Sequence, residues 1–212
     1  NISSNIPTSA VNVIKEDTKN DKVLYVGTDN GLYVSFNNGN SWNPFSKGFP
    51  NVAVHDLVIQ PEAKELVVGT HGRSIYKADI SKLQNFESYI NKATHLFKIS
   101  GMRFSSNWGA SRSQWSKPSV PSLKVPVFSS KAKKITMNVY SGKVLVNSFS
   151  VNADKGYNTA SYDVTFSNKG RKAYLKANKK AKINKAKNGL YYLPKGKYVL
   201  KVEEEKQTFE IK

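Results

Sequence analysis

Residues 23–42 read VLYVGTDNGLYVSFNNGNSW, and residues 66–76 read LVVGTHGRSIY, with the two Val-Gly-Thr triplets 42 positions apart. Each copy has an apolar run that ends in Val-Gly-Thr, then a polar turn, then a second short apolar run. Short apolar and β-branched runs bounded by Gly, Asn and Asp are typical of antiparallel hairpins. The stretch therefore predicts an antiparallel sheet that occurs twice.

A repeat of about 40 residues with several short strands is typical of the blades of a β-propeller. Propellers close with roughly 4–8 blades, and this chain holds fewer than two copies. We therefore expect residues 1–80 to be terminal blade material and the chain to be the closing part of a larger protein. The expected strands are residues 11–16, 23–28, 32–36, 54–59, 65–69 and 74–77.

The segment from Ser35 to Trp42 fits the Asp-box pattern S-x-D-x-G-x-T-W, with Asn37 in the Asp place and Ser41 in the Thr place. A short polar side chain such as Asn37 bonds backbone groups of its own turn. Gly39 supplies a backbone conformation that other residues avoid. We expect a structural turn here, with Trp42 packed beneath the hairpin.

These motifs, taken with others in the first 98 residues, resemble those of a known class of proteins. Together with FPN at 49–51, VHDLVIQP at 54–61 and ELVVGTHGRSIY at 65–76, they resemble the closing blades of bacterial sortilin-like, BNR-repeat propeller proteins over about residues 5–98. Such proteins are often called glycosyl-hydrolase-like by analogy. The resemblance implies an exported protein of Bacteroidetes type that is secreted, periplasmic or associated with the outer membrane.

The next segment, residues 81–126, is expected to be a capping helix and a linker. Ser81 followed by Gln84 forms a capping box, which predicts a helix that runs to about Ile90. Residues 100–126 are rich in Ser, Pro and Gly, as linkers are.

Residues 127–212 return to strand patterns, expected at 135–140, 144–151, 157–164, 196–202 and 208–211. KGYNTASYDVT at 155–165 and YLPKGKYVLKVEEEKQTFEIK at 192–212 resemble the terminal immunoglobulin-like domain of FlgD-like and type IX secretion sorting modules. The predicted fold class is all-β: final β-propeller blades followed by a small immunoglobulin-like β-sandwich.

Charge is divided unevenly. Residues 1–80 carry 7 Lys/Arg and 8 Asp/Glu, whereas residues 81–212 carry 26 and 7. A run without acids spans residues 169–187, and its candidate anion-binding residues are Lys172, Lys179, Lys180 and Lys182. The main interpretation is a solvated loop between sandwich strands; the alternative is a site for an anionic glycan or lipopolysaccharide. Nucleic acid is disfavoured, since Tyr174 alone interrupts the run.

Other candidates are fewer. His71 and Arg73 lie at the second hairpin turn and are candidate binding residues. The three histidines lack metal-ligand spacing and the chain has no cysteine, so we expect neither a metal nor a cofactor. Trp108, Trp115, Tyr191 and Tyr192 are either a sugar-stacking surface or, as we expect, packing anchors. No apolar run reaches the roughly 20 residues of a transmembrane helix.

These observations predict a non-catalytic binding and assembly module of an exported bacterial cell-envelope propeller protein. Its expected partners are the remaining blades of a precursor or another envelope protein. Two alternatives stay open. One is the C-terminal part of an Asp-box glycoside hydrolase-like enzyme whose catalytic acids lie outside this chain. The other is a type IX secretion sorting module.

Overall fold

The structure, a computed structural model, describes residues 1–45 and 48–212 and divides into two compact units. Unit 1 is Asn1–Ser88 and unit 2 is Tyr89–Lys212. The fold is mostly β, as predicted, with four sheets of antiparallel strands. None of these sheets closes on itself within the described residues. The division falls after Ser88, a few residues beyond the change in charge near residue 80.

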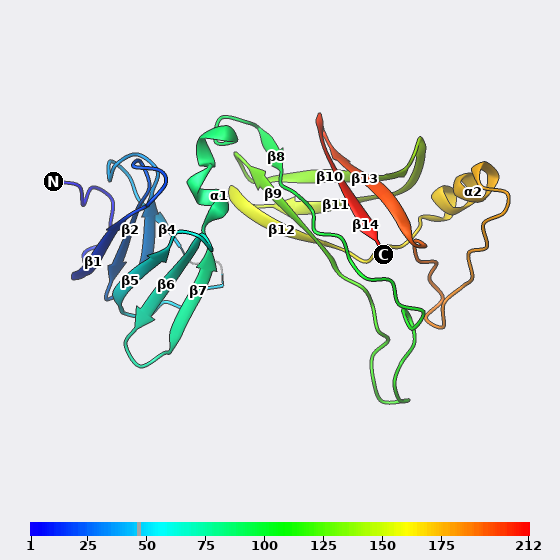
Figure 1. The fold of residues 1–212 in the computed structure, drawn as a ribbon, viewed down its shortest axis with the longest axis horizontal. Coiled ribbons are helices and arrows are strands. Elements are labelled where there is room, and N and C mark those ends of the chain that lie inside the picture. The colour runs from blue at the N-terminus through cyan, green and yellow to red at the C-terminus, as the bar shows by residue number, and fades with distance from the viewer. Residues whose placement is uncertain (46–47) are drawn as a thin grey trace. The chain divides into compact units, whose positions relative to one another are not determined.

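Unit 1 holds two sheets whose strands follow one another in sequence order (Figure 1). The predicted strands are confirmed to within two residues at their ends, and one two-residue strand was not predicted. The first sheet contains β1 (Val11–Glu16), β2 (Leu24–Thr28), β3 (Gly31–Ser35) and the unpredicted β4 (Asn43–Pro44); the second contains β5 (Val54–Gln60), β6 (Glu65–Thr70) and β7 (Ile75–Asp79).

The two sheets of unit 1 meet where β2 passes β5. Gly27 of β2 lies so close to β5 that an added Cβ would be 2.5 Å from Val54 Cγ1. The same Cβ would be 2.8 Å from Val13 Cγ1 of the neighbouring strand β1. Val54 is fully buried by this contact. A residue without a side chain is therefore required at this crossing, because any Cβ would push the sheets apart.

A buried carboxylate ties the first sheet to the end of the unit. Asp17, only 4% exposed, accepts hydrogen bonds from Tyr25 Oη at 3.0 Å, from Gln84 Nε2 at 3.1 Å and from the Lys19 backbone N–H at 2.8 Å. Burying a carboxylate is tolerated only when its oxygens are hydrogen-bonded, which is the case here.

Gln84 belongs to helix α1 (Ser81–Gln84), which is shorter than predicted. The predicted capping box is wrong: Ile80 occupies the N-cap and no side chain caps the helix. The Ser81 N–H instead donates to Asp79 Oδ1 at 2.8 Å. A short 3₁₀ turn, η1 (Phe86–Ser88), follows in place of a helix to Ile90. The Gln84 side chain points to Asp17, so it is unavailable for the capping bond.

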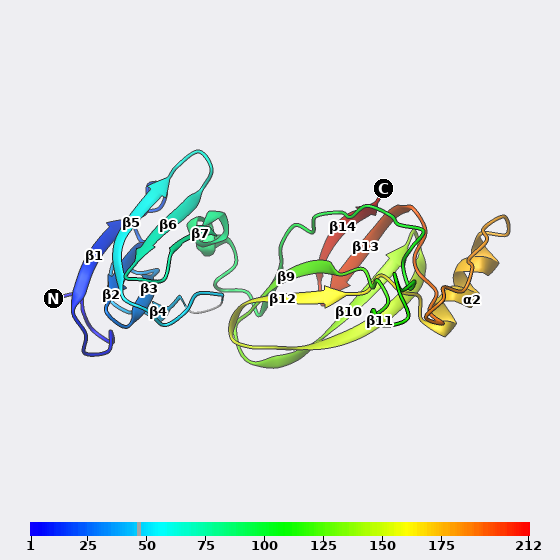
Figure 2. The same cartoon turned by 90° about the horizontal axis from the view of Figure 1, so that it is seen from below.

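Unit 2 is built from two sheets around one core (Figure 2). All five strands predicted beyond residue 127 are present. One sheet runs in the order β12 (Gly156–Tyr162), β9 (Leu123–Ser129), β8 (Thr94–Leu96); the other runs β11 (Val144–Ala153), β10 (Lys133–Ser141), β13 (Gly196–Val202), β14 (Glu205–Ile211). Alternate residues of these strands are buried, as expected for sheets with one face on a core.

The segment expected to be a linker is partly packed. Met102 exchanges backbone hydrogen bonds with β14: its N–H donates to Glu210 O at 2.9 Å, and its carbonyl accepts from Lys212 N at 3.0 Å. Phe104 N–H donates to Lys212 O at 2.8 Å. Residues 102–104 therefore extend the edge of the larger sheet in parallel with β14.

The basic run, expected to be a loop, begins as a helix. Helix α2 (Asn168–Ala177) is capped by Ser167, whose Oγ accepts from Gly170 N at 3.0 Å. Gly170 rests directly on β11, where an added Cβ would overlap the Val146 carbonyl. Arg171 stacks its guanidinium 4.1 Å from the centre of the Tyr191 ring. A cap, a close backbone contact and a stacked cation thus hold the helix on the sheet.

We predict that Gly170→Ala destabilises unit 2 by about 2 kcal/mol or more, because the new methyl group must lift α2 from β11. Helix propensity alone predicts the opposite, a gain of about 1 kcal/mol. Urea unfolding of the whole chain measures the difference. The matched control is Ala173→Gly at an exposed position of the same helix, which should cost about 1 kcal/mol. A stabilised Gly170→Ala variant would show that α2 is not held by this contact.

Candidate functional site

The turn after β3 uses its own side chains. Asn37 Oδ1 accepts from Ser35 Oγ at 3.0 Å and from Ser41 N at 2.9 Å, and Asn37 Nδ2 donates to Ser41 Oγ at 2.9 Å. Ser35 Oγ also accepts from Gly39 N at 2.9 Å. Gly39 has a φ of +82°, in the region that favours glycine. Both polar atoms of the Asn37 amide are thus engaged within the turn.

Trp42 at the end of this turn is anchored to the N-terminal segment. Its indole N–H donates to Ile2 O at 2.7 Å, and its backbone N–H and carbonyl both bond the Asn5 amide, at 2.7 and 2.9 Å. The side chain is only 3% exposed. This geometry holds a packed hairpin end and leaves the indole ring without an open face for a ligand.

The second hairpin turn presents His71 and Arg73 to solvent. It is closed by Thr70 Oγ1, which donates to Ser74 O at 2.6 Å. The His71 ring lies 5.4 Å from the His55 ring, centre to centre. Within residues 1–45 and 48–212, however, His, Cys, Asp and Glu side chains do not gather in a group of three that could hold a metal ion.

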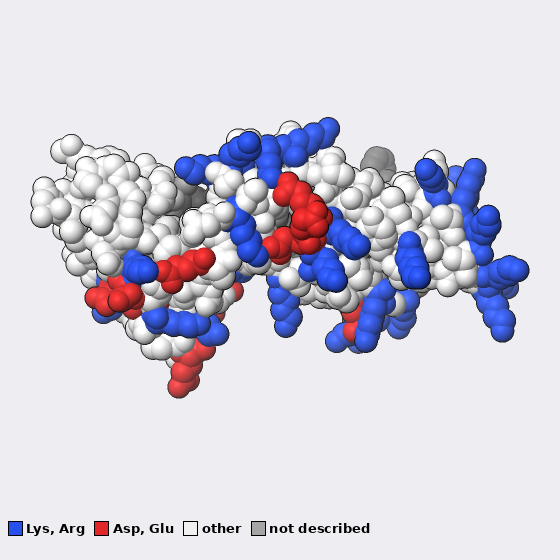
Figure 3. All heavy atoms as spheres, turned by 90° about the horizontal axis from the view of Figure 1, so that it is seen from above, with Lys and Arg blue, Asp and Glu red and all other residues white. Residues whose placement is uncertain are grey.

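The candidate lysines form one continuous basic surface, which we define as α2 together with residues 178–189. Lys169, Lys172 and Lys176 are spaced by three and four residues and therefore share the outer face of α2. Figure 3 shows the Lys and Arg side chains gathered over this part of unit 2. Exposed lysines continue along the loop at Lys179, Lys180, Lys182, Lys185 and Lys187.

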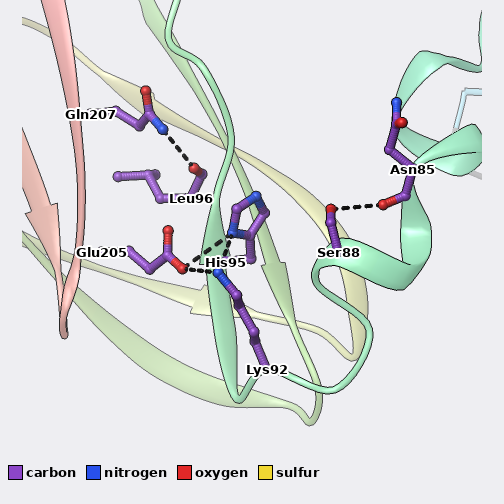
Figure 4. Close-up of polar contacts among 7 residues, drawn as sticks. All are labelled: Asn85, Ser88, Lys92, His95, Leu96, Glu205 and Gln207. Atoms are coloured by element: carbon purple, nitrogen blue, oxygen red, sulfur yellow. Dashed lines mark hydrogen bonds and ion pairs between the residues drawn. The ribbon is translucent and has the colours of Figure 1, made fainter.

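A second charged group joins β8 to the start of β14 (Figure 4). Glu205 Oε1 lies 2.7 Å from Lys92 Nζ and 3.2 Å from His95 Nδ1. In the same place Gln207 Nε2 donates to Leu96 O at 3.2 Å. Partial burial acts to raise the pKa of Glu205, but the hydrogen bonds from Lys92 and His95 outweigh it and hold that pKa below its usual value. The group connects β8 to β14.

Tyr89 completes this group from the other side. Its ring stacks on His95, with 5.5 Å between centroids and 4° between planes. Burial raises the pKa of Tyr89 to about 12. A phenol with that pKa is protonated at neutral pH and is a poor general base.

The four aromatic residues considered for sugar stacking do not share a surface. Trp108 is 8% exposed and packs on Tyr192 at 5.7 Å between centroids, and Tyr191 lies under Arg171. Trp115, by contrast, is 87% exposed. The expectation of a packing anchor is therefore wrong for Trp115, which the sequence does not distinguish from Trp108.

The candidate residues fall into separate units. The turn at 35–42 and the turn at His71 belong to unit 1, whereas the lysines belong to unit 2. Within the described part of the chain, no helix is long and apolar enough to cross a bilayer. No protein-family model and no curated protein sequence matches this chain.

We predict that Glu205→Gln lowers the free energy of unfolding of unit 2 by about 1 kcal/mol at neutral pH. Because the pKa of Glu205 is lowered on folding, its contribution is present above the unfolded pKa of about 4.3 and is lost as the pH falls through the folded value. Urea unfolding at about pH 7 and about pH 3.5 should show a smaller difference between the two chains at the lower pH.

The control for this experiment is Glu204→Gln, which removes the same charge from an exposed position of the same turn. We expect it to leave the free energy of unfolding within about 0.5 kcal/mol of the unmodified chain. Equal losses for the two variants, or an equal loss at both pH values for Glu205→Gln, would contradict the assigned role.

Proposed function

We propose that this chain is a non-catalytic binding and assembly module of an exported bacterial cell-envelope protein. In this proposal the two sheets of unit 1 are neighbouring blades of a β-propeller, and unit 2 is an immunoglobulin-like sandwich. The supporting observation is a packing contact between the two sheets of unit 1, in which a valine of one sheet covers a glycine of the other. The equivalent glycine and the equivalent valine on the two outer faces are both uncovered.

The sheets repeat their register as well as their sequence. Val11 pairs with Thr28 and Val13 with Gly27, with a bulge between Val11 and Val13. In the second sheet Val54 pairs with Thr70 and Asp56 with Gly69, with a bulge at the same place. Val11 thus corresponds to Val54, and Gly27 corresponds to Gly69.

The equivalent positions differ in what covers them. Val54 of the second sheet is fully buried against Gly27 of the first, whereas its counterpart Val11 is 52% exposed. Similarly, Leu57 is 1% exposed and its counterpart Ile14 is 48% exposed. Val11 and Ile14 of the first sheet are therefore exposed, although their counterparts in the second sheet are buried.

The outer face of the second sheet carries the glycine of this contact without a valine over it. An added Cβ at Gly69 meets nothing nearer than Asp56 of its own sheet, at 3.6 Å, whereas one at Gly27 would collide with Val54. Alternation along strands places Val58 and Ile75 on the same face as Gly69. Both are exposed, at 52% and 75%. This face fits a further blade-like sheet that lays a Val54-type residue over Gly69.

Two glycine variants test the stacking relationship. Gly27→Ala should cost about 1–3 kcal/mol, because Val54 is β-branched and cannot easily move aside. Gly69→Ala should change the stability of the isolated chain by less than about 0.5 kcal/mol, since its surroundings are open. Urea unfolding followed by tryptophan emission measures both, in a chain that also carries Trp108→Phe and Trp115→Phe so that only Trp42 of unit 1 emits. An equal loss in the free energy of unfolding for the two variants would show that Gly69 is not an open counterpart of Gly27.

The assembly role is tested with Gly69→Leu, which fills the open position without touching the core of unit 1. In the full protein that carries this segment, we expect the variant to raise the protease sensitivity of unit 1 and to leave unit 2 unchanged. The control is Thr208→Leu, which adds a similar side chain at an exposed position of β14 in unit 2. Polysaccharide hydrolysis that disappears when an acidic residue of unit 1 is replaced would contradict the non-catalytic assignment.

A further inference from the structure

A loop of unit 2 ends in an exposed tryptophan. Between Ala110 and Ser119 the chain leaves the sheets and returns: Gly109 N donates to Ser119 O at 2.7 Å, and Ser119 N donates to Ala110 O at 2.9 Å. Figure 1 shows this bright green segment, between β8 and β9, running away from the strands. Trp115 near its tip is 87% exposed, with exposed Arg112 and Lys117 on either side.

The base of this loop rests on the basic surface. An added Cβ at Gly109 would be 2.5 Å from Asn188 Oδ1 and 2.8 Å from Ala186 Cβ. Asn188 Nδ2 in turn donates to Tyr192 Oη at 2.8 Å. Both ribbon views place the two segments together (Figures 1 and 2). The lysines on either side of Ala186 therefore lie at the root of the tryptophan loop.

The two segments that form the tryptophan loop and the basic surface carry charge of one sign. Residues 98–126 and 164–202 contain no Asp and no Glu. The cations of α2 are held on a fixed support, since this helix is docked on β11 through Gly170. A large field of one sign on a rigid support attracts an anionic partner and costs self-repulsion without one.

An exposed indole flanked by Arg112 and Lys117, on a loop whose root lies among lysines, has the chemistry of a membrane-binding surface. Tryptophan prefers the boundary between headgroups and acyl chains, and lysines are drawn to anionic lipids. Binding to a bilayer surface strengthens with the buried apolar area and with the electrostatic attraction to anionic lipids. A single-stranded nucleic acid would instead need a groove with successive aromatics. Trp115 is 87% exposed, whereas Trp108 packs on Tyr192.

We propose that this end of unit 2 binds a bilayer surface that carries anionic phosphate headgroups. Trp115 enters the headgroup layer, and the basic surface with Arg112 and Lys117 faces the lipid phosphates. All of these residues belong to unit 2, so bilayer binding does not depend on the stacking proposed for unit 1.

The test uses the full 212-residue chain and vesicles of phosphatidylcholine with about one third phosphatidylglycerol. We expect binding to these vesicles, weak binding to pure phosphatidylcholine, and a blue shift of tryptophan emission that Trp115→Ala removes. Trp115→Ala should lower the partition coefficient about tenfold or more, with partial recovery in Trp115→Phe. The indole is exposed, so the fold should be unaffected.

The lysines are tested with Lys185→Gln combined with Lys187→Gln. Each lysine near an anionic surface contributes about fivefold, so the pair should lower the partition coefficient about 25-fold. The matched control is Lys131→Gln with Lys155→Gln, which removes the same charge. Both lysines lie in turns at one end of the β10–β11 pair, and α2 rests on the other end, at Val146. This control should stay within about twofold of the unmodified chain.

Three results would overturn the proposal. One is an absence of binding to the anionic vesicles at an ionic strength of about 0.1 M. Another is equal loss in the two lysine pairs, which would show that net charge acts and not this surface. The third is unchanged vesicle binding by Trp115→Ala together with equally strong binding to a soluble acidic polysaccharide, which would make the surface a general polyanion site.

Discussion

The contact of Val54 with Gly27 determines how unit 1 is built. Sheets that pack face to face normally lie about 10 Å apart, with side chains between them. At this crossing one sheet supplies no side chain, so the first strand of the next sheet can approach closely. The bulge that precedes Asp56 turns Val54 toward that position. The same bulge and the same glycine occur in both sheets, and the glycine of the first sheet is the one that receives a valine from a neighbouring sheet.

Most strands of both units were predictable because local sequence specifies them, but β4, β8 and β9 were not predicted, and β8 and most of β9 lie in the segment expected to be a capping helix and linker. Alternating apolar residues separated by Gly, Asn and Asp identified strands and turns such as that at Gly31. The bulges and the pairing of Met102 with β14 were not predictable, because they depend on contacts between segments distant in the chain. The same holds for Gln84, which the buried carboxylate of Asp17 diverts from a capping role.

Helix α2 was missed for a different reason. Its lysines, alanines and leucine are good helix formers, but its apolar stripe is narrow because a glycine occupies the centre of the packed face. Without a hydrophobic period, the run is indistinguishable from a solvated loop. Trp108 and Trp115 present a similar problem: both follow serine-rich sequence, and only the rings of Phe104 and Tyr192 make one of them part of the core.

The two surfaces that we assign differ in the forces on which they depend. The stacking proposed over Gly69 would bury apolar surface, an interaction that responds little to salt. The basic surface acts through charge, which physiological salt screens over about 8 Å. Tyr89–Lys212 carries 25 Lys/Arg and six Asp/Glu, so unit 2 repels itself in the free state. An anionic surface relieves this repulsion, and by linkage any anion that binds the folded unit also raises its stability. Salt therefore distinguishes the two surfaces without any change to the sequence.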